Sequence, residues 1–162
     1  MIPRNYVGPL PTPAFPQQVS AVVSPPLIGW MSGEISATKG QQPLGIARYV
    51  GKIVAVNMSI GNAGKDDASA NSPRVSGEVY INGTSCLTTR PSIGYLSGEL
   101  AGAQKSTYVD ADDACVQRAV INTSANTLAV GDVITWSLTY GGSSSPTVKA
   151  QNPCIIVEVV PT

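Results

Sequence analysis

Apolar and polar residues alternate on both sides of an Asn-Gly pair near the middle of the chain. The pair is Asn82-Gly83, and β-prone runs precede and follow it. Asn-Gly tolerates the positive φ angles that a type I′ turn needs at both central positions, and this turn matches the twist of paired strands. The pattern predicts a β-hairpin with Ile81 opposite Thr84. Its core face would then hold Val75, Gly77, Val79, Ile81 and Cys86, and its opposite face Glu78, Tyr80 and Leu87. A leucine on the second face indicates that this face is covered too.

Five further segments have the pattern of strands. They are Leu27–Ile35, which contains two glycines, Gly51–Gly61, Cys115–Thr123, Val133–Tyr140 and the nearly continuous apolar run Cys154–Val160. Alternation with a period of two is typical of half-buried strands. It places Val54, Val56, Met58 and Ile60 on one face of the second segment, and Ile134, Trp136, Leu138 and Tyr140 on the inward face of the fourth.

The remaining segments are rich in Gly, Pro, Ser and Asn. Ser36–Ala47, Asn62–Pro73 and Gly141–Pro146 are expected to be loops, and Pro91–Ala114 has no clear pattern. No amphipathic helix of 12 residues or more is present. Short strands separated by turn signals predict an all-β, antiparallel β-sandwich or jelly roll over residues 27–162.

Residues 1–26 form a separate, proline-rich N-terminal arm. They hold seven of the thirteen prolines, which lack an amide donor and fix φ, so the segment is expected to run extended. A disordered tail is one reading, although such tails are usually depleted in aromatic and branched residues. We favour an arm that orders against its own domain or a neighbouring subunit. Its candidate anchors are Tyr6, Val7, Leu10 and Phe15.

Charge and composition exclude several function classes. Ten basic and ten acidic residues cancel, and charged residues make up only 12% of the chain. Without a basic excess we expect no nucleic-acid partner and no anionic membrane surface. The chain has no histidine, which excludes Ser-His-Asp and Cys-His catalysis and the commonest zinc sites. The chain contains no run of 18 apolar residues, so no membrane span is expected, and the N-terminus does not resemble a signal peptide.

The other reactive side chains do not form a recognisable motif. The three cysteines, Cys86, Cys115 and Cys154, lack Cys-x-x-Cys spacing. We expect all three to be buried as small hydrophobic side chains, with a Cys86–Cys115 disulfide as the alternative. The acidic run 110–113 lacks the EF-hand spacing and is expected to be a solvated loop. Glu78 and Glu158 occupy outward strand positions that solubility explains. The sequence therefore predicts no catalytic residue, no cofactor and no metal, and a protein that is not an enzyme.

Three segments together resemble a known pattern: Gly51–Gly61, the hairpin with VYINGTSCLTTRPSI, and NTLAVGDVITWSLTYGG from Asn126 to Gly142. They are similar to small jelly-roll proteins of tailed bacteriophages, which act as capsid decoration (cement) proteins or head fibres. A strand ending in Gly-x-x-Gly precedes an Asn-Gly hairpin, and a Leu-x-x-Gly-Asp turn precedes the penultimate strand. The resemblance covers about 110 residues, Gly51–Pro161.

The resemblance implies a homotrimer on the outer surface of an icosahedral capsid, bound to the major capsid protein and stabilising it. On this reading the arm residues Tyr6, Val7, Leu10 and Phe15 contact the capsid or another subunit. The alternative is a carbohydrate- or receptor-binding module of a phage fibre, in which exposed aromatics and loops such as Asn62–Pro73 would contact the ligand.

Overall fold

The computed structural model describes residues 24–66, 73–96, 98–100, 102–110, 113–142 and 145–162. The predicted arm anchors Tyr6, Val7, Leu10 and Phe15 lie outside the described residues. Among the residues that the structure describes, no helix is long and apolar enough to cross a membrane.

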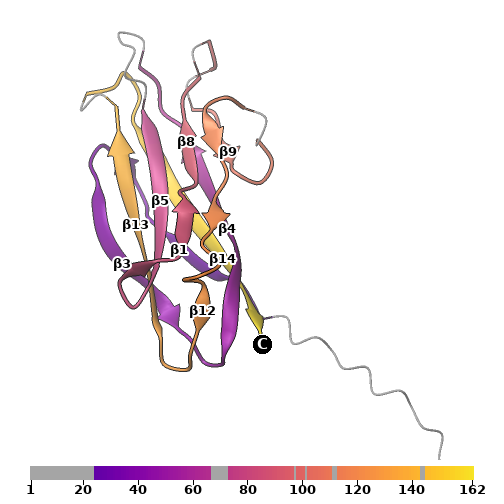
Figure 1. Ribbon diagram of the computed structural model, residues 1–162. Helices are drawn as coiled ribbons and strands as arrows, with labels where there is room; N and C mark the ends of the chain where they lie inside the picture. The colour runs from indigo at the N-terminus through magenta and orange to yellow at the C-terminus, as the bar shows by residue number, and fades with distance from the viewer. Residues whose placement is uncertain (1–23, 67–72, 97, 101, 111–112, 143–144) are drawn as a thin grey trace, which may run out of the picture.

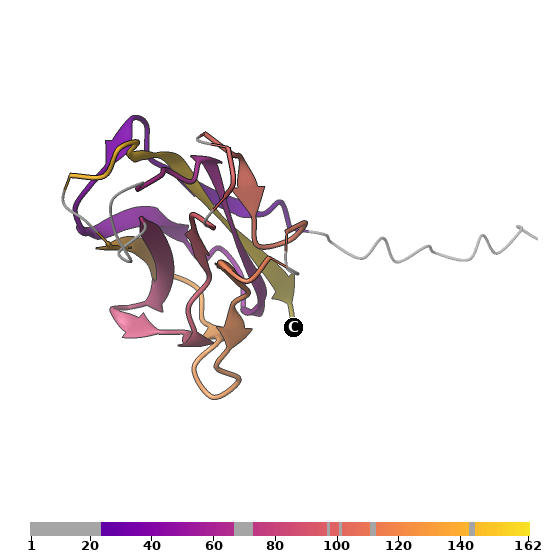
Figure 2. The ribbon, with the colours of Figure 1, turned by 90° about the horizontal axis from the view of Figure 1, so that it is seen from above.

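Two antiparallel sheets pack against each other (Figures 1 and 2). The first sheet has the order β1 (Leu27–Trp30), β14 (Ala150–Pro161), β4 (Gly51–Asn62) and β12 (Thr127–Leu128), with β2 (Glu34–Ile35) on β14 and β9 (Lys105–Ser106) on β4. The second has the order β10 (Val116–Gln117), β8 (Ser92–Gly94), β5 (Arg74–Ile81), β13 (Val133–Gly141) and β3 (Lys39–Ile46), with β6 (Thr84–Ser85) on β5. A two-stranded ribbon pairs β7 (Leu87–Thr89) with β11 (Val120–Ile121).

The strand order identifies the connectivity. The first sheet contains the neighbours β1, β14, β4 and β9, and the second contains β3, β13, β5 and β8. Consecutive strands among these eight lie in opposite sheets along the chain, except that β5 and β8 lie in the same sheet. This connectivity is the double Greek key of a jelly roll. The core between the sheets is apolar, and its largest fully buried side chains include Trp136, Ile53 and Met58. The predicted all-β sandwich is confirmed for the described residues.

The central hairpin has the predicted register. Asn82 and Gly83 have φ angles of 49° and 83°, and Ile81 pairs with Thr84. Val75, Val79 and Cys86 are buried in the core. Leu87 is buried as well, because the chain leaves the second sheet after Cys86 and pairs with β11. Leu87 therefore joins the same core cluster as Val79 and Cys86, which corrects its predicted place on the opposite face of the hairpin.

A second turn is joined to the hairpin by side chains. In the Leu128–Asp132 turn, the Asp132 carboxylate accepts the Ala129 backbone N–H at 2.7 Å. The other Asp132 oxygen accepts a hydrogen bond from Asn82 Nδ2, also at 2.7 Å. The Val133 backbone N–H donates to Asn82 Oδ1 at 2.9 Å. Asn82 thus provides the left-handed turn residue and also links the two turns at the start of β13.

One face assignment in β4 was wrong. Val54 points away from the core and is 47% exposed, whereas Ile53 is fully buried. The pairing between β4 and β14 shifts register at this point, with Ala55 opposite Glu158 and Ile53 opposite Val159. A β-bulge of this kind adds one residue to one strand and reverses the inward and outward positions beyond it.

The predicted loop Ser36–Ala47 was also wrong, because most of it forms β3. This eight-residue strand pairs with β13 at the edge of the second sheet. An edge strand tolerates glycine and proline because one side makes no ladder hydrogen bonds, and Pro43 lies beside a register shift.

Two predicted strands are interrupted. The Leu27–Ile35 segment forms β1 and β2 with a bend at Gly33, whose φ is 87°. The Cys115–Thr123 segment forms β10, which joins the second sheet, and β11, which joins the ribbon.

Candidate interaction surfaces

The outer face of the first sheet carries an apolar strip. Ile28 and Trp30 are 56% and 70% exposed, while Gly29 between them faces the core. Ile28 lies opposite Ile156 and Trp30 lies opposite Cys154 on β14, and Ile156 and Cys154 flank the fully buried Ile155. Strand alternation therefore places all four outward side chains side by side.

The strip continues toward the start of β1. The bulge in β4 turns Val54 outward, and Val160 near the end of β14 is also about half exposed. We define the outer strip by six residues on the neighbouring strands β1, β14 and β4: Ile28, Trp30, Val54, Cys154, Ile156 and Val160. The exposed Glu158 lies between Ile156 and Val160 on this face of β14, so the strip has a main apolar part around Ile28 and Trp30 and an outlying part at Val54 and Val160. An exposed group of large apolar side chains is typical of a surface that binds another macromolecule.

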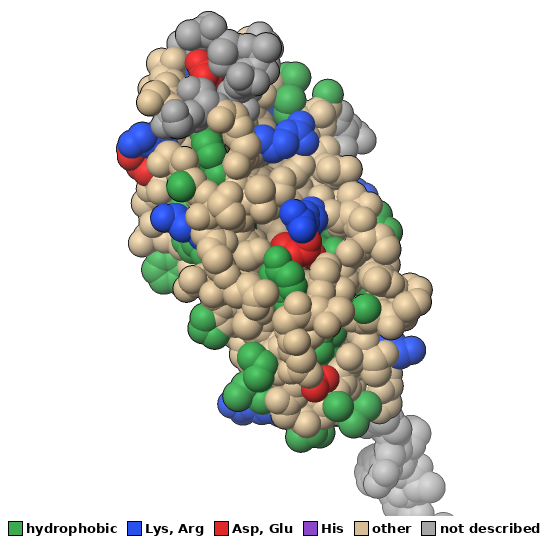
Figure 3. All heavy atoms as spheres, turned by 60° about the vertical axis from the view of Figure 1, so that its left-hand side comes forward, with side chains coloured by type: hydrophobic (Ala, Val, Ile, Leu, Met, Phe, Trp, Pro, Cys, Tyr) green, Lys and Arg blue, Asp and Glu red, His purple; other side chains and the backbone are tan. Residues whose placement is uncertain are grey.

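Charge does little to counteract association of this protein. Charged residues make up 12% of the chain and their signs cancel. Figure 3 shows the consequence on one face, where basic and acidic side chains stand singly or in small groups among polar and apolar ones. A surface of this composition has no long-range repulsion between copies.

A polar groove of about 570 Å³ adjoins the outer strip. Its lining residues come from β4, β9, β14 and the segment after β9: Ser59, Ile60, Gly61, Gln104, Lys105, Ser106, Val109, Asp110 and Asn152. Cys154 pairs with both Trp30 and Ser59, so the groove begins two strands away from the exposed indole. Tyr108, which is also exposed, follows β9.

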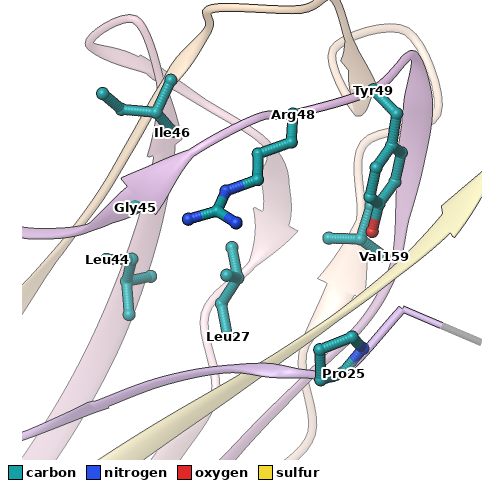
Figure 4. A pocket seen from close by; sticks show the side chains of 8 residues that line it. All are labelled: Pro25, Leu27, Leu44, Gly45, Ile46, Arg48, Tyr49 and Val159. Carbon is teal, nitrogen blue, oxygen red and sulfur yellow. The ribbon is translucent and has the colours of Figure 1, made fainter.

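A second, apolar groove lies at the open side of the sandwich, where the edge strands β1 and β3 approach each other (Figure 4). We call it the edge groove; it has a volume of about 840 Å³ and is lined by Pro25, Leu27, Leu44, Gly45, Ile46, Arg48, Tyr49 and Val159. Leu27, Leu44 and Tyr49 are half-buried and pack against the core. The groove is therefore an unsealed margin of the hydrophobic core.

Arg48 introduces one positive charge into the edge groove. Figure 4 shows its guanidinium group extending between Leu27 and Leu44, away from the Tyr49 ring. Within the part of the chain that the structure describes, no carboxylate forms an ion pair with Arg48. Its N–H donors are directed into the groove, where an acceptor on a bound chain could reach them.

Glu78 is buried, which corrects the prediction of a solvated outward position. Only 3% of its surface is exposed, and its carboxylate accepts hydrogen bonds from Ser85 Oγ at 2.6 Å and from Arg90 Nε. Burial chiefly, and then the Glu78 charge, raise the pKa of Cys86 to about 12. The Cys86 thiol is therefore protonated at neutral pH and serves as a core residue. Glu158 is exposed as predicted.

A second buried ionic cluster surrounds Lys105, which is only 5% exposed. Its ammonium group lies 2.6 Å from Asp113 and 2.7 Å from Glu99, and it donates to the Gly94 carbonyl at 2.9 Å. Burial lowers the pKa of Lys105, but the hydrogen bonds and charges of Asp113 and Glu99 outweigh this and raise the pKa overall. The cluster ties β9 to the segments on both sides of it.

The acidic run and the cysteines have structural environments. Asp110 accepts the Ser106 N–H at 2.7 Å, and Asp113 is held by Lys105. Among the described residues no group of His, Cys, Asp or Glu could hold a metal ion. All three cysteines are free thiols, so the alternative Cys86–Cys115 disulfide does not form. Cys86 is fully buried, whereas Cys115 and Cys154 are half-buried.

No protein-family model matches the chain. No curated protein matches it in sequence.

Sequence reasoning missed both apolar surfaces. Alternation through Leu27, Gly29 and Met31 would have placed Trp30 outward, but the glycines made the strand difficult to assign. The edge groove forms where residues far apart in the sequence meet, and only the proximity of Leu44 to Tyr49 is visible along the chain.

Proposed function

We propose that this chain is a structural virion protein, a decoration protein that binds the outer surface of a tailed-bacteriophage capsid as a homotrimer and stabilises it. The observation that supports the proposal most directly is the outer strip, an apolar surface centred on Trp30 on a weakly charged jelly roll. The sequence resemblance to capsid decoration proteins supplies the partner, the major capsid protein.

The outer strip has the composition of a binding surface. Burying a large apolar side chain contributes about 1.5–3 kcal/mol, and tryptophan is among the residues that most often dominate interface energies. Trp30 lies on β1, which is paired with β14 and is packed onto the Trp136 indole at Gly29. The backbone of Trp30 is therefore fixed before binding. Three such surfaces in one trimer would bind a symmetric capsid site with avidity.

Binding of the full chain to undecorated capsids tests this proposal. We expect Trp30→Asp to weaken binding by at least about a hundred-fold, because a carboxylate would face an apolar contact. The indole is 70% exposed, so folding should be unaffected. Val120→Asp, at an exposed position on the β7–β11 ribbon, is the matched control and should bind normally. Equal binding of both variants and the natural chain would contradict the role of the outer strip.

A carbohydrate-binding role is the second candidate, and the polar groove favours it. Trp30 stands two strands from Ser59 on the groove wall, and Asn152 adds an amide. An aromatic ring beside hydroxyl and amide groups suits a sugar, which has one apolar face and several hydroxyls. A glycan array probed with the full chain and Trp30→Ala tests this role. Signals that Trp30→Ala abolishes would support it, and an array without signals would contradict it.

A further inference from the structure

We infer that the edge groove of one copy holds the segment Pro9–Pro16 of a second copy, so that N-terminal arms are exchanged within the oligomer. The inference rests on the homotrimer in the proposed function and is independent of capsid binding. It assigns an occupant to the edge groove and a contact to Phe15.

The groove has the features of a site for an extended, proline-rich chain. Its walls carry one aromatic ring, Tyr49, beside Pro25 and aliphatic side chains, against which an extended segment can bury its prolines and apolar side chains. An extended proline-rich chain leaves its carbonyl groups without internal hydrogen bonds. The Arg48 guanidinium projects into the groove and can donate to such a carbonyl (Figure 4).

Free strand edges border the groove. Within the described residues, β1 pairs only with β14, and β3 pairs only with β13. Each therefore has one edge whose backbone groups can accept another strand. An apolar channel between two open edges is suited to an added extended segment, which would seal the core margin at Leu27 and Leu44.

The prolines of the arm are spaced for such an edge position. Pro9, Pro11 and Pro13 alternate with Leu10, Thr12 and Ala14. If the docked segment takes the β-strand conformation, successive N–H groups point to opposite sides, so the three missing donors fall on one side and three intact donors fall on the other. The intact side can pair with β1 or β3, and the proline side cannot recruit another strand. Phe15 shares the face of the prolines and supplies an aromatic ring for the groove.

The position of the arm indicates that the occupant comes from a second copy. Pro25 lines the groove, so the arm leaves its own domain at this site. To re-enter its own groove, Pro9–Pro16 would have to reverse direction within residues 17–24. That stretch reads QQVSAVVS, which has two serines, the weaker turn formers, but no Gly, Pro, Asn or Asp, and four of its residues are Val or Ala. An extended arm instead covers about 28 Å between Pro16 and Pro25 at 3.1 Å per residue, far enough to reach a neighbour.

Exchange of this kind closes a symmetric ring. Each copy gives one arm and receives one, so the contact is heterologous and a three-fold arrangement satisfies every groove. Prolines lower the entropy that the arm loses on docking, which favours binding of a segment with few other contacts.

The test is photocross-linking of the full chain with Phe15 replaced by p-benzoylphenylalanine. Light and nitrogen-15-labelled proteins are unfolded together, refolded, checked for native mass and irradiated. We expect cross-links from position 15 to the groove segments 25–27 and 44–49, with mixed-isotope pairs about as frequent as same-isotope pairs. Same-isotope pairs alone would show that each arm occupies its own groove and would overturn exchange. Cross-links confined to other surfaces would overturn the assignment of the groove.

A pair of exposed-site variants makes the test specific. Ile46 lines the groove and is 63% exposed, so Ile46→Asp should fold normally and reduce the groove cross-link about ten-fold. Val120→Asp, outside the groove at a 52% exposed position, should leave the yield unchanged. An unchanged yield in Ile46→Asp would contradict the inference. A monomeric full chain that still binds capsids would overturn arm exchange and the homotrimer, yet leave the decoration role intact.

Discussion

Substitution of Gly29 by alanine tests how β1 is seated between the core and the outer strip. A β-carbon at Gly29 would lie 2.6 Å from Trp136 Nε1 and 2.7 Å from Leu44 Cδ2. Neither distance is compatible with van der Waals contact, and the Trp136 indole is 2% exposed with little space to move. Gly29→Ala must therefore displace the indole, the leucine or β1 itself.

The expected destabilisation follows from two opposing terms. Overpacking a core by one methyl group costs about 1–3 kcal/mol, and replacing a strand glycine by alanine recovers about 0.5–1 kcal/mol. Because two buried groups are approached below 3 Å at once, the cost falls at the upper end of its range. We expect a net loss of about 2 kcal/mol in the free energy of unfolding, or a fall in Tm of about 4–8 °C.

Thermal and urea unfolding at one fixed protein concentration measure this loss, because self-association makes Tm depend on concentration. Gly45→Ala is the matched control: its β-carbon would lie 3.6 Å from Leu27 Cδ2, an ordinary contact, so Tm should stay the same or rise slightly. Trp136→Phe combined with Gly29→Ala should recover part of the loss, since the smaller ring frees space. Equal stability of Gly29→Ala and Gly45→Ala would refute this account of the packing.

Three further predictions concern the polar contacts. Lys105→Met should lower the free energy of unfolding by about 3 kcal/mol in urea titrations, because the carboxylates of Asp113 and Glu99 lose their cation. An unchanged urea midpoint would show that the cluster does not stabilise the fold. Burial raises the pKa of Asp113, but the hydrogen bond from Lys105 outweighs this and lowers the pKa below its ordinary value of 3.8. The ion pair therefore stabilises the fold fully at pH values above 3.8, and this stabilisation is lost as the pH falls through the lowered pKa. Tm measured from pH 6 to pH 2 should therefore fall less steeply in Lys105→Met than in the natural chain. Asn82→Ala should cost about 2 kcal/mol and Asn82→Gly about 1 kcal/mol, because both lose the hydrogen bonds to Asp132 and Val133 but only alanine is strained at positive φ; equal losses would contradict the contribution of φ.

Features set by neighbouring residues could be predicted from the sequence. The Asn82-Gly83 turn needs only two residues with positive φ, and the strand pattern around it fixes which side chains face inward. The alternation in β13 likewise buried Ile134, Trp136 and Leu138 as expected. The number and spacing of such segments were enough to predict an all-β sandwich.

Features set by distant partners could not be predicted in the same way. Val54 turns outward because of a bulge in the pairing with β14, about 100 residues later in the chain. Glu78 is an exception, because its partners Ser85 and Arg90 are near in sequence, but strand alternation alone does not show that they pair with its carboxylate. β3 contains glycine and proline and exists as a strand because β13 provides a partner edge.

The candidate surfaces also differ in whether the sequence alone reveals them. The arm could be recognised from its prolines, and its anchors Tyr6, Val7, Leu10 and Phe15 remain predictions for contact with a capsid protein or another subunit. The outer strip and the edge groove required the structure, because each combines side chains from strands that are remote in sequence.

The most direct test of the proposed function is a binding isotherm of the full chain on undecorated phage heads, followed by electron microscopy of the saturated particles. We expect saturable binding, density for trimers on the outer capsid surface, and loss of that density with Trp30→Asp but not with Val120→Asp. Heads that stay bare at saturating concentrations of a correctly folded chain would contradict the decoration role.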